Sequence, residues 1–414
     1  MERRRVVVTG IGALTPIGHG ADGLWSGVRE GRCGIRVIDR FDTSQVSTKV
    51  AAQIEDFDPL AHFEPKLARR LDRFAQLALA ACDMALQDAR LTLDAKSPND
   101  RIGVTMGTAL GGIAGAEKQH ENYVRDGLRA VDTSLALTVF GGSGSSNIAI
   151  RYGCMGPSNA NSNSCSSGAI AIGEAYRYIK EGYADTMIAA SAEAPLYELT
   201  FSAFTLIRTM STNPDPAAAC RPFDGNRDGF VMGEAAAVLV MEELGHALHR
   251  DAPIYCELLG YACNNDAHHM VSSRPDGKAA SRAIALALEE ARLTPADIGY
   301  INAHASSTQL NDRVETQVLK QAFGEHSRTI PISGTKSMHG HALGASGAVE
   351  AAICAMVFQH DFLPPTIHLE TPDPECDLDY IPQTGRPARV DAILSNSFGF
   401  GGINATLVFG RYLA

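Results

Sequence analysis

The sequence predicts an α/β protein made of two similar halves, on three observations. Short apolar runs typical of buried strands alternate with stretches of helical periodicity. An extended stretch, a helix rich in small residues and a strand with a Ser- or Gly-rich exit occur in that order over 158–192 and again over 330–399. The length of 414 residues also exceeds that of most single cores. We therefore expect one half over residues 1–250 and the other over residues 251–414.

The individual elements follow from the spacing of apolar residues. Apolar side chains recur every three or four positions from Leu67 to Met84, which predicts one amphipathic helix over 66–89. The Pro-rich segment 211–228 is predicted to be a loop or cover segment. The remaining runs predict buried strands at 5–10, 102–106, 186–190, 236–241, 254–259, 299–302, 330–333 and 392–395, and helices at 165–178, 279–291 and 344–358.

Charge and cysteine content exclude several classes of protein. The formal net charge of −11 argues against a general nucleic-acid binder, which needs a basic excess. The nine cysteines are scattered and include no Cys-x-x-Cys pair, as expected for a reduced protein. The apolar run Val6–Val8 is too short for a signal peptide, and no run approaches the roughly 18 apolar residues of a membrane span. We expect a soluble cytoplasmic protein without nucleic-acid or membrane partners.

A candidate nucleophile, Cys165, lies in the sequence Asn-Ser-Cys-Ser-Ser-Gly at 163–168, where a helix is predicted to begin. Helix N-termini carry partial positive charge and free N–H groups, which favour the thiolate form of cysteine. The small neighbours leave room for a substrate to reach the sulfur. The alternative is a packed cysteine at a tight helix crossing, an interpretation that fits the other eight cysteines.

Two further segments supply histidines and a lysine. His304 follows directly on a predicted strand, and strand ends are where α/β proteins place functional side chains. The Gly-flanked segment 334–341 contains Lys336, His339 and His341. The His-x-His spacing could indicate a metal site, but no Asp, Glu or Cys stands at a ligand spacing nearby, so we expect neither metal nor cofactor. Taken alone, each histidine could also be a hydrogen-bonded structural residue.

The fourth segment, Ser-Asn-Ser-Phe-Gly-Phe-Gly-Gly at 395–402, is unusually rich in glycine for a plain strand. Its composition suits a loop whose backbone approaches a ligand closely or must move. A glycine-rich turn between two terminal strands is the alternative.

In this order and spacing, the four segments resemble the β-ketoacyl synthases of the thiolase superfamily. The resemblance runs from Val7 to Leu407 and includes Arg-Pro-Phe-Asp at 221–224 and Arg-Asp-Gly-Phe-Val-Met-Gly-Glu at 227–234. It implies a thiolase-like five-layered α/β/α/β/α fold and a dimer. It also implies an acyltransferase that condenses a cysteine-bound acyl chain with malonyl-(acyl carrier protein), with loss of carbon dioxide, in fatty-acid or type II polyketide synthesis.

The resemblance also assigns the chemistry-bearing residues. Cys165 corresponds to the acyl-accepting nucleophile, and His304 and His341 to its paired histidines. Lys336 corresponds to the active-site lysine and Glu350 to its ion-pair partner. A pair of histidines suits elongating synthases, whereas a His and Asn pair would suggest the initiating ones. His339 stands where the family usually has Thr, so it is not expected to be catalytic.

Other positions are expected to surround the substrate. Phe400 corresponds to the gating residue of the acyl pocket, and the backbone N–H groups of Phe400 and Cys165 correspond to the oxyanion hole. Ser306 and Thr308 resemble the hydroxyl residues that bind the phosphopantetheine arm of the carrier protein. Ala305 replaces the usual Gly and Ser306 the usual Thr; these departures leave the reaction class intact but put ordinary housekeeping substrates in doubt.

The expected partners are an acyl carrier protein bearing acyl and malonyl thioesters and a second synthase subunit. Carrier proteins are acidic, as is this chain, so docking requires a local basic patch. A solvated helix face is the alternative for these cations. The dimer is either a homodimer or a heterodimer with a chain-length-factor-like subunit. The docking candidates are Lys66, Arg69, Arg70 and Arg73, which recur at helical spacing, and Arg208.

Two other functions fit the residues less well. A non-catalytic, chain-length-factor-like subunit would lack the nucleophile and histidines that this chain has. A degradative thiolase would have a late Cys-x-Gly, whereas the last cysteine, Cys376, is followed by Asp377 and Leu378. Among synthases, segments 311–316 and 373–380 resemble type II polyketide ketosynthases and 398–402 resembles fatty-acid enzymes, and we favour a specialised pathway.

Overall fold

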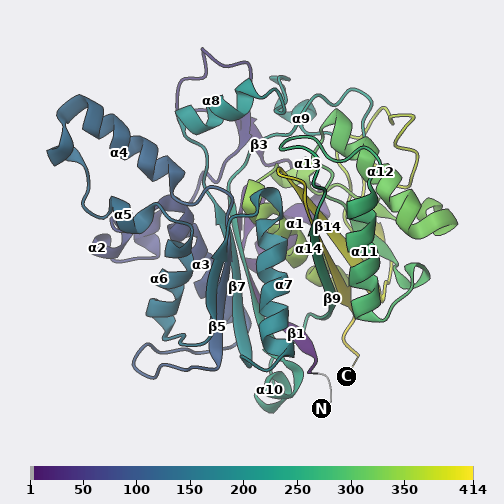
Figure 1. Ribbon diagram of the computed structural model, residues 1–414, viewed down its shortest axis with the longest axis horizontal. Helices are drawn as coiled ribbons and strands as arrows, with labels where there is room; N and C mark the ends of the chain where they lie inside the picture. The colour runs from purple at the N-terminus through teal and green to yellow at the C-terminus, as the bar shows by residue number, and fades with distance from the viewer. Residues whose placement is uncertain (1–3, 414) are drawn as a thin grey trace.

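The computed structural model describes residues 4–413, which form five stacked layers of helices and sheets (Figure 1). The principal strands are hydrogen-bonded into one continuous sheet whose two halves, the first and second sheets, lie in separate layers that alternate with three helical layers. The outer face of one sheet is covered by α3 (Arg73–Asp88) and α6 (Gly142–Tyr152), and that of the other by α11 (Lys278–Ala291) and α12 (Gln309–Phe323). Helices α7 (Ser167–Lys180) and α14 (Ser346–His360) lie between the sheets. The predicted five-layered α/β/α/β/α fold is confirmed.

The first sheet mixes parallel and antiparallel strands. Strand β5 pairs in parallel with β6 and β7, whereas β8 runs antiparallel to both β7 and β1. Numbered along the chain, the spatial order is third, second, fourth, fifth, first. The strands in that order are β6 (Ser158–Asn161), β5 (Ile102–Gly107), β7 (Thr186–Glu193), β8 (Ala235–Glu243) and β1 (Val6–Thr15).

The second sheet repeats this arrangement. Strand β10 pairs in parallel with β11 and β14, whereas β15 runs antiparallel to both β14 and β9. Its strands follow the same order of third, second, fourth, fifth, first, so the two halves share one topology without obvious sequence identity. They are β11 (Ile332–Ser333), β10 (Tyr300–Asn302), β14 (Ala392–Gly399), β15 (Ile403–Gly410) and β9 (Cys256–Asn265).

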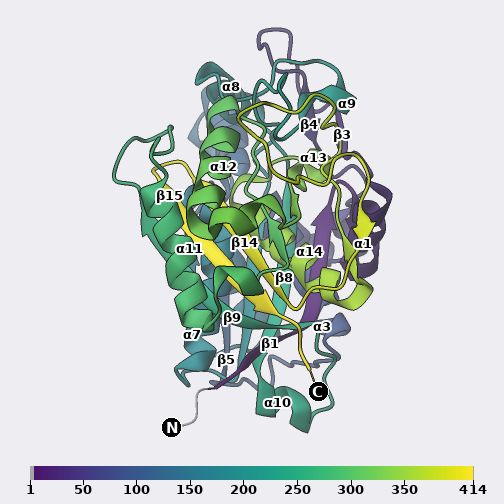
Figure 2. The ribbon, with the colours of Figure 1, turned by 90° about the vertical axis from the view of Figure 1, so that its right-hand side faces the viewer.

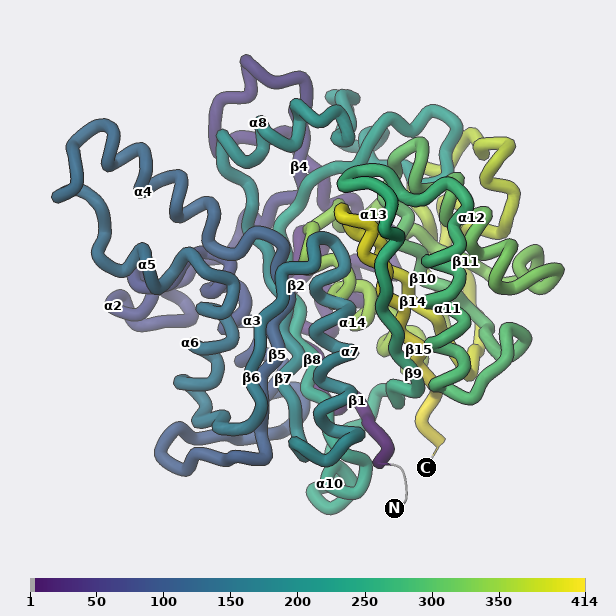
Figure 3. Tube along the Cα trace, viewed as in Figure 1, coloured from purple at the N-terminus to yellow at the C-terminus, as the bar shows by residue number. Residues whose placement is uncertain are grey.

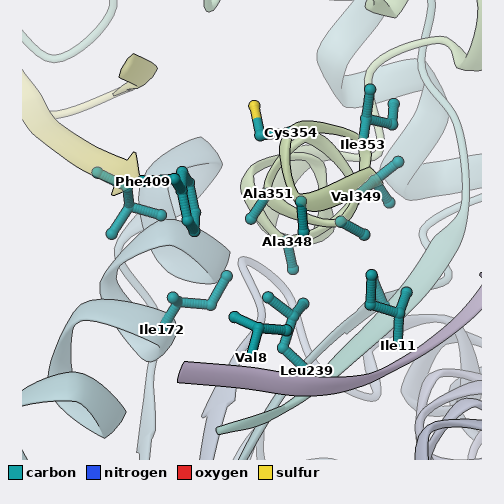
Figure 4. Packing of buried hydrophobic residues seen from close by; sticks show 14 of the residues in the cluster. Val8, Ile11, Ile172, Leu239, Ala348, Val349, Ala351, Ile353, Cys354 and Phe409 are labelled. Carbon is teal, nitrogen blue, oxygen red and sulfur yellow. The ribbon is translucent and has the colours of Figure 1, made fainter. Parts of the chain in front are cut away.

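The core lies where the halves meet. Strands β1 and β9 pair directly, with Val7 opposite Glu257. Helix α14 is buried on all its sides from Ser346 to Phe358, as expected for a helix without a polar face. Figure 4 shows side chains of this helix beside Phe409 of β15 and above side chains of β1 and β8. The two central helices therefore bury apolar surface against both sheets, which fixes the halves relative to each other.

Longer connections gather at the end of the molecule opposite the two termini (Figure 2). This end contains β3 (Ile35–Val37), β4 (Val50–Ala52), α8 (Glu198–Leu206), α9 (Pro216–Ala219) and α13 (Lys336–His339). Helices α4 (Ile113–Asp126) and α5 (Leu135–Thr138) project to one side of the first sheet (Figure 3). The remaining elements are β2 (Gly18–His19), α1 (Gly20–Glu30), α2 (Pro65–Ala68), α10 (Leu244–His249), β12 (Phe362–Leu363), β13 (Arg386–Pro387) and the 3₁₀ turns Pro59–Ala61, Leu128–Ala130, Ser164–Ser166, Pro295–Asp297, Gly324–Arg328 and Leu343–Ala345.

Two predicted elements need correction. The single helix expected over 66–89 is two helices, α2 and α3, because the chain turns at 69–72 and Asp72 begins a new helix by accepting a hydrogen bond from the Phe74 N–H. The strand predicted at 392–395 continues to Gly399, so the glycine-rich turn comprises only 400–402. The segment 211–228 is largely irregular, as predicted, with α9 as a single helical turn.

Candidate active site

Cys165 lies in a tight turn that leads into the central helix α7. Ser164, immediately before it, has a left-handed backbone (φ 53°), an uncommon conformation for a non-glycine residue. The Ser166 hydroxyl donates to the carbonyl oxygens of Ser397 (3.0 Å) and Ile403 (2.9 Å), which fixes the turn to the second half. Because such strained backbone persists only where its surroundings hold it, these bonds fix the position of the sulfur.

One cavity of about 140 Å³ unites the predicted residues of both halves. Cys165, Thr209 and Phe230 reach it from the first half. The second half contributes the ends of β10 and β14, the turn before α14, the loop after β9 and the start of α12. The residues that line it are Cys165, Thr209, Phe230, Val271, Ser272, Ser273, His304, Ser306, Thr308, Leu310, Asn311, His341, Leu343, Phe398, Gly399 and Phe400.

The electrostatics of Cys165 differ from the sequence-based expectation. Burial raises the pKa of its thiol above the ordinary value, and this effect outweighs the Ser164 hydroxyl, the Lys336 ammonium and the Phe400 backbone N–H, which all lower the pKa. Burial therefore opposes the thiolate that the helix start was expected to favour. The N–H of Phe400 nevertheless points at the sulfur, where an oxyanion donor would be needed.

His304 and His341 both line the cavity and pack edge to face, with ring centroids 5.4 Å apart and ring planes at 80°. The Lys336 Nζ lies 3.4 Å from Nδ1 of His304 and donates to the His304 carbonyl oxygen at 2.6 Å. The Ser346 hydroxyl lies 2.9 Å from Nδ1 of His341. Burial first, and the Lys336 charge second, lower the pKa of both histidines well below 6.5, so both rings are neutral at physiological pH.

Lys336 and Glu350 lie behind the histidines and do not line the cavity. They form a fully buried ion pair, as expected from the resemblance. Burial raises the pKa of Glu350 to about 7, an effect that the Lys336 charge opposes. The pair therefore contacts the site through the backbone and ring of His304.

The sequence reasoning missed an acidic residue that supports His304. Glu315 on α12 accepts hydrogen bonds from the backbone N–H groups of His304 (2.8 Å) and Ala305 (2.7 Å). Burial raises the pKa of Glu315 to about 7. In the sequence, Glu315 is singled out only by its position in the segment 311–316. Its hydrogen bonds to the backbone of His304 and Ala305 depend on how the loop folds, so the sequence does not predict them.

The turn after β14 combines both interpretations of the glycine-rich segment. Gly401 (φ 83°) and Gly402 (φ 73°) form a turn between two terminal strands. A side chain at Gly399 would come within 3.2 Å of the Cys165 backbone N, so the end of β14, just before the turn, approaches Cys165 closely. The Phe400 ring stacks on Phe204 with centroids 6.4 Å apart.

The hydroxyls of Ser306 and Thr308 lie 3.0 Å apart in the same cavity. The loop that carries them has left-handed backbone at Ala305 (φ 42°) and Ser307 (φ 67°), so the Ala that replaces the family's usual Gly is held in a conformation that favours Gly. The two residues expected from the resemblance to bind the arm therefore line the same cavity as Cys165.

The predicted docking cations do not form one helical face. Arg73 pairs with the buried Glu234, as does Arg40, so Arg73 is held in place by a structural ion pair. Lys66 lies on α2, Arg69 and Arg70 lie in the turn after it, and Arg208 follows α8 in the chain. All four of Lys66, Arg69, Arg70 and Arg208 are exposed.

Two general properties complete the description. No helix within residues 4–413 is long and apolar enough to cross a bilayer. In the same described range, no three His, Cys, Asp or Glu side chains gather closely enough to hold a metal ion.

The α/β fold has two halves, and its buried cysteine shares one cavity with two neutral histidines. This combination defines an acyltransferase of the condensing-enzyme class. Residues 3–247 match the β-ketoacyl synthase N-terminal domain and residues 255–370 match the β-ketoacyl synthase C-terminal domain. The chain therefore belongs to the β-ketoacyl synthase family.

Individual relatives agree with this placement. The chain is 45% identical to a 3-oxoacyl-[acyl-carrier-protein] synthase 2 of Synechocystis, covering 100% of this chain and 99% of that protein. It is 43% identical to a putative polyketide β-ketoacyl synthase 1 of Streptomyces cyaneus, covering 98% and 97%. A solved type II polyketide synthase complex of an acyl-carrier protein with its ketosynthase contains a similar chain, with a TM-score of 0.90, 34% identity and full coverage of both.

Proposed function

We propose that the chain condenses an acyl group held on Cys165 with malonyl-(acyl carrier protein), yielding a β-ketoacyl carrier protein and carbon dioxide. The observation that carries this proposal is the cavity shared by Cys165 and two neutral histidines from the other half. Relatives named as 3-oxoacyl-[acyl-carrier-protein] and polyketide synthases support the same reaction.

The first half-reaction transfers the acyl group. Cys165 attacks the carbonyl carbon of the acyl thioester, and the carrier's thiol leaves with the proton that the Cys165 thiol gives up. The backbone N–H groups of Cys165 and Phe400 stabilise the oxyanion, each such donor lowering the barrier by about 3–4 kcal/mol. The Phe400 side chain closes the acyl pocket until the chain enters.

In the second half-reaction, malonyl-(acyl carrier protein) loses carbon dioxide, and the electron pair of the broken bond forms an enolate. His304 and His341 donate Nε2–H to the thioester oxygen on which the charge develops. Lys336 beside Nδ1 of His304, and Ser346 beside Nδ1 of His341, favour this tautomer, because each presents a donor to Nδ1. The enolate carbon then attacks the acyl carbonyl, and the C–S bond to Cys165 breaks.

The remaining assignments complete the proposal. Ser306 and Thr308 bind the phosphopantetheine arm, and the exposed Lys66, Arg69, Arg70 and Arg208 attract the acidic carrier protein. The enzyme works in the cytoplasm, consistent with nine unpaired cysteines, as a homodimer or as the active half of a heterodimer. The two named relatives differ by two percentage points in identity, so similarity does not distinguish a fatty-acid from a polyketide pathway.

Substitution of the nucleophile tests the reaction. Cys165→Gln should remove the acyl-enzyme mass and abolish condensation, while malonyl decarboxylation continues because both histidines remain. Intact-mass analysis of enzyme and carrier protein, with malonyl-(acyl carrier protein) and a panel of acyl primers, measures both and shows which chains are extended. Cys263→Ser, at an exposed cysteine, is the control. Chain elongation by Cys165→Gln would refute the assignment.

A further inference from the structure

Arg227 is a buried cation outside the reacting groups, with 1% of its side chain exposed. It lies in the segment between α9 and β8 and does not line the cavity. Its Nη1 pairs with Asp373 at 2.8 Å and its Nε lies 3.3 Å from Asp312, both of which are buried acids. A buried charge is tolerated only when it is paired and fully hydrogen-bonded, so this guanidinium is held in one orientation.

The guanidinium also holds the loop that carries the hydroxyls of Ser306 and Thr308, which are proposed to bind the arm. Its Nε donates to the Thr308 carbonyl oxygen at 3.0 Å, and its Nη2 donates to the Gln309 carbonyl oxygen at 2.9 Å. On the same loop, the Ser307 hydroxyl accepts a hydrogen bond from the Arg221 N–H at 3.0 Å. The outer side of the loop is therefore fixed by 221–227, while its inner side presents Ser306 and Thr308 to the cavity.

This loop needs external support because of its backbone. Ala305 and Ser307 are both left-handed, and non-glycine residues in this region are strained. Such strain persists only where the surroundings hold the chain. Glu315 supports the loop at Ala305, and Arg227 supports it at Thr308, on the far side of the strained residues.

We infer that Arg227 is a positioning residue for the thioester arm: its bonds to the Thr308 and Gln309 carbonyl oxygens set the hydroxyls of Ser306 and Thr308 at arm-binding distance. The inference rests on the proposed function, which assigns these hydroxyls to the arm. Arg227 acts through the loop and touches no reacting atom. Its loss should therefore weaken recognition of the arm more than it slows the chemical step.

The experiment offers the full-length enzyme two malonyl thioester substrates. One carries pantetheine, and the other carries ethanethiol, which lacks the arm. In Arg227→Lys the charge remains but the forked donor set is lost. The KM for the pantetheine thioester should rise about tenfold, as expected for loss of one charge-assisted hydrogen bond, with a much smaller rise for the ethanethiol thioester. Arg313→Ala, which removes an exposed partner of the same Asp373, should preserve the wild-type ratio of the two KM values.

Two further variants separate the possible failures. Thr308→Ala must raise the same KM ratio; if it does not, the arm assignment in the proposed function is wrong. If it does, and Arg227→Lys lowers the melting temperature while keeping the wild-type ratio, Arg227 is only structural and the inference is overturned. Should Arg227→Lys fail to fold, Asp373→Asn weakens the same orientation without removing the guanidinium, and an unchanged ratio there also overturns the inference.

Discussion

At the scale of single residues, the charge of Lys336 acts on three buried histidines, His304, His339 and His341. His339, which replaces the family's usual Thr, is 1% exposed, and its Nε2 lies 3.3 Å from the Thr335 hydroxyl. Burial lowers the pKa of His339 to about 3, with the Lys336 charge adding to the effect. His339 lies outside the cavity lining, so its neutrality bears on stability rather than on substrate contact.

This residue should make stability depend on pH. Below pH 6.5 the unfolded chain binds a proton at His339 that the folded protein does not bind until about pH 3. The folded protein therefore keeps its full stability at this position above pH 6.5, and its free energy of unfolding decreases as the pH falls from 6.5 towards about 3. The free energy of unfolding of the wild type should fall by about 1.4 kcal/mol per pH unit more than that of His339→Thr over this window.

Urea denaturation of both proteins at several pH values measures the difference. His249→Thr, at an exposed position, is the matched control and should follow the wild-type profile. Parallel profiles for wild type and His339→Thr would show that the imidazole is solvated or charged in the folded protein.

How far the sequence predicts the site also depends on the residue. Cys165, His304 and His341 could be found because each stands at a helix start, a strand end or a glycine-flanked loop, positions with a local signal. The raised thiol pKa could not, because burial is a property of the packed fold. Nor could Glu315 and Ser346, whose partners are determined by how the loops fold.

At the scale of elements, two pseudo-equivalent helices cross at glycines beside the nucleophile. Each begins with a 3₁₀ turn whose first residue is left-handed, Ser164 (φ 53°) before α7 and Leu343 (φ 40°) before α14. A side chain at Gly168 would come within 2.8 Å of the Ala348 N, and one at Gly347 within 2.8 Å of the Ala169 N. The tight helix crossing and the nucleophile, posed as alternatives from sequence, are therefore one feature.

A methyl group at this crossing should disturb both stability and chemistry. Gly168→Ala places a Cβ 2.8 Å from backbone atoms that cannot move aside, which should lower the free energy of unfolding by about 1–3 kcal/mol. Because the displaced turn carries Cys165, acyl transfer should also slow by at least about tenfold.

Calorimetry and the rate of acyl-enzyme formation by mass spectrometry measure the two effects. Gly23→Ala on α1 is the control, since its Cβ would meet nothing closer than 3.4 Å. Wild-type stability and acylation in Gly168→Ala would show that the helices have room to separate.

Sequence patterns predict that a helix or strand exists better than they predict the residues at which it begins and ends. The periodicity from Leu67 to Met84 spans the break between α2 and α3 because both helices bury residues in the same core cluster. The local signals for the break, Pro65 at the first turn of α2 and Asp72 as the cap of α3, were readable but weaker than the apolar pattern. The apolar pattern predicts an end for β14 at residue 395, four residues too early. Its last residues include Ser and Gly, which carry no apolar strand signal although they pair with β15.

At the scale of the whole molecule, the two halves share one topology but contribute different residues to the site. The first half supplies the proposed nucleophile, and the second supplies the histidines, the lysine and the loop proposed to bind the arm. The site forms only where the two sheets meet across α7 and α14, which explains why the candidate segments lie far apart in the sequence. Docking also depends on a property of the whole molecule, its net charge of −11. A chain with this charge repels an acidic carrier protein except near local cations.

Charge reversal near α2 tests this docking argument. Arg69→Glu/Arg70→Glu should raise the KM for carrier-borne substrates about tenfold or more, with a far smaller effect on the same acyl group carried by a short thiol. Lys96→Glu/Arg282→Glu changes the net charge equally at other exposed sites and is the control. Added salt should weaken the carrier interaction of the wild type more than that of the docking variant, because screening removes an attraction that the variant already lacks. Equal KM changes in both double variants would mean that only net charge matters, and equal changes for both kinds of substrate would mean that these arginines act on the site and not on the carrier.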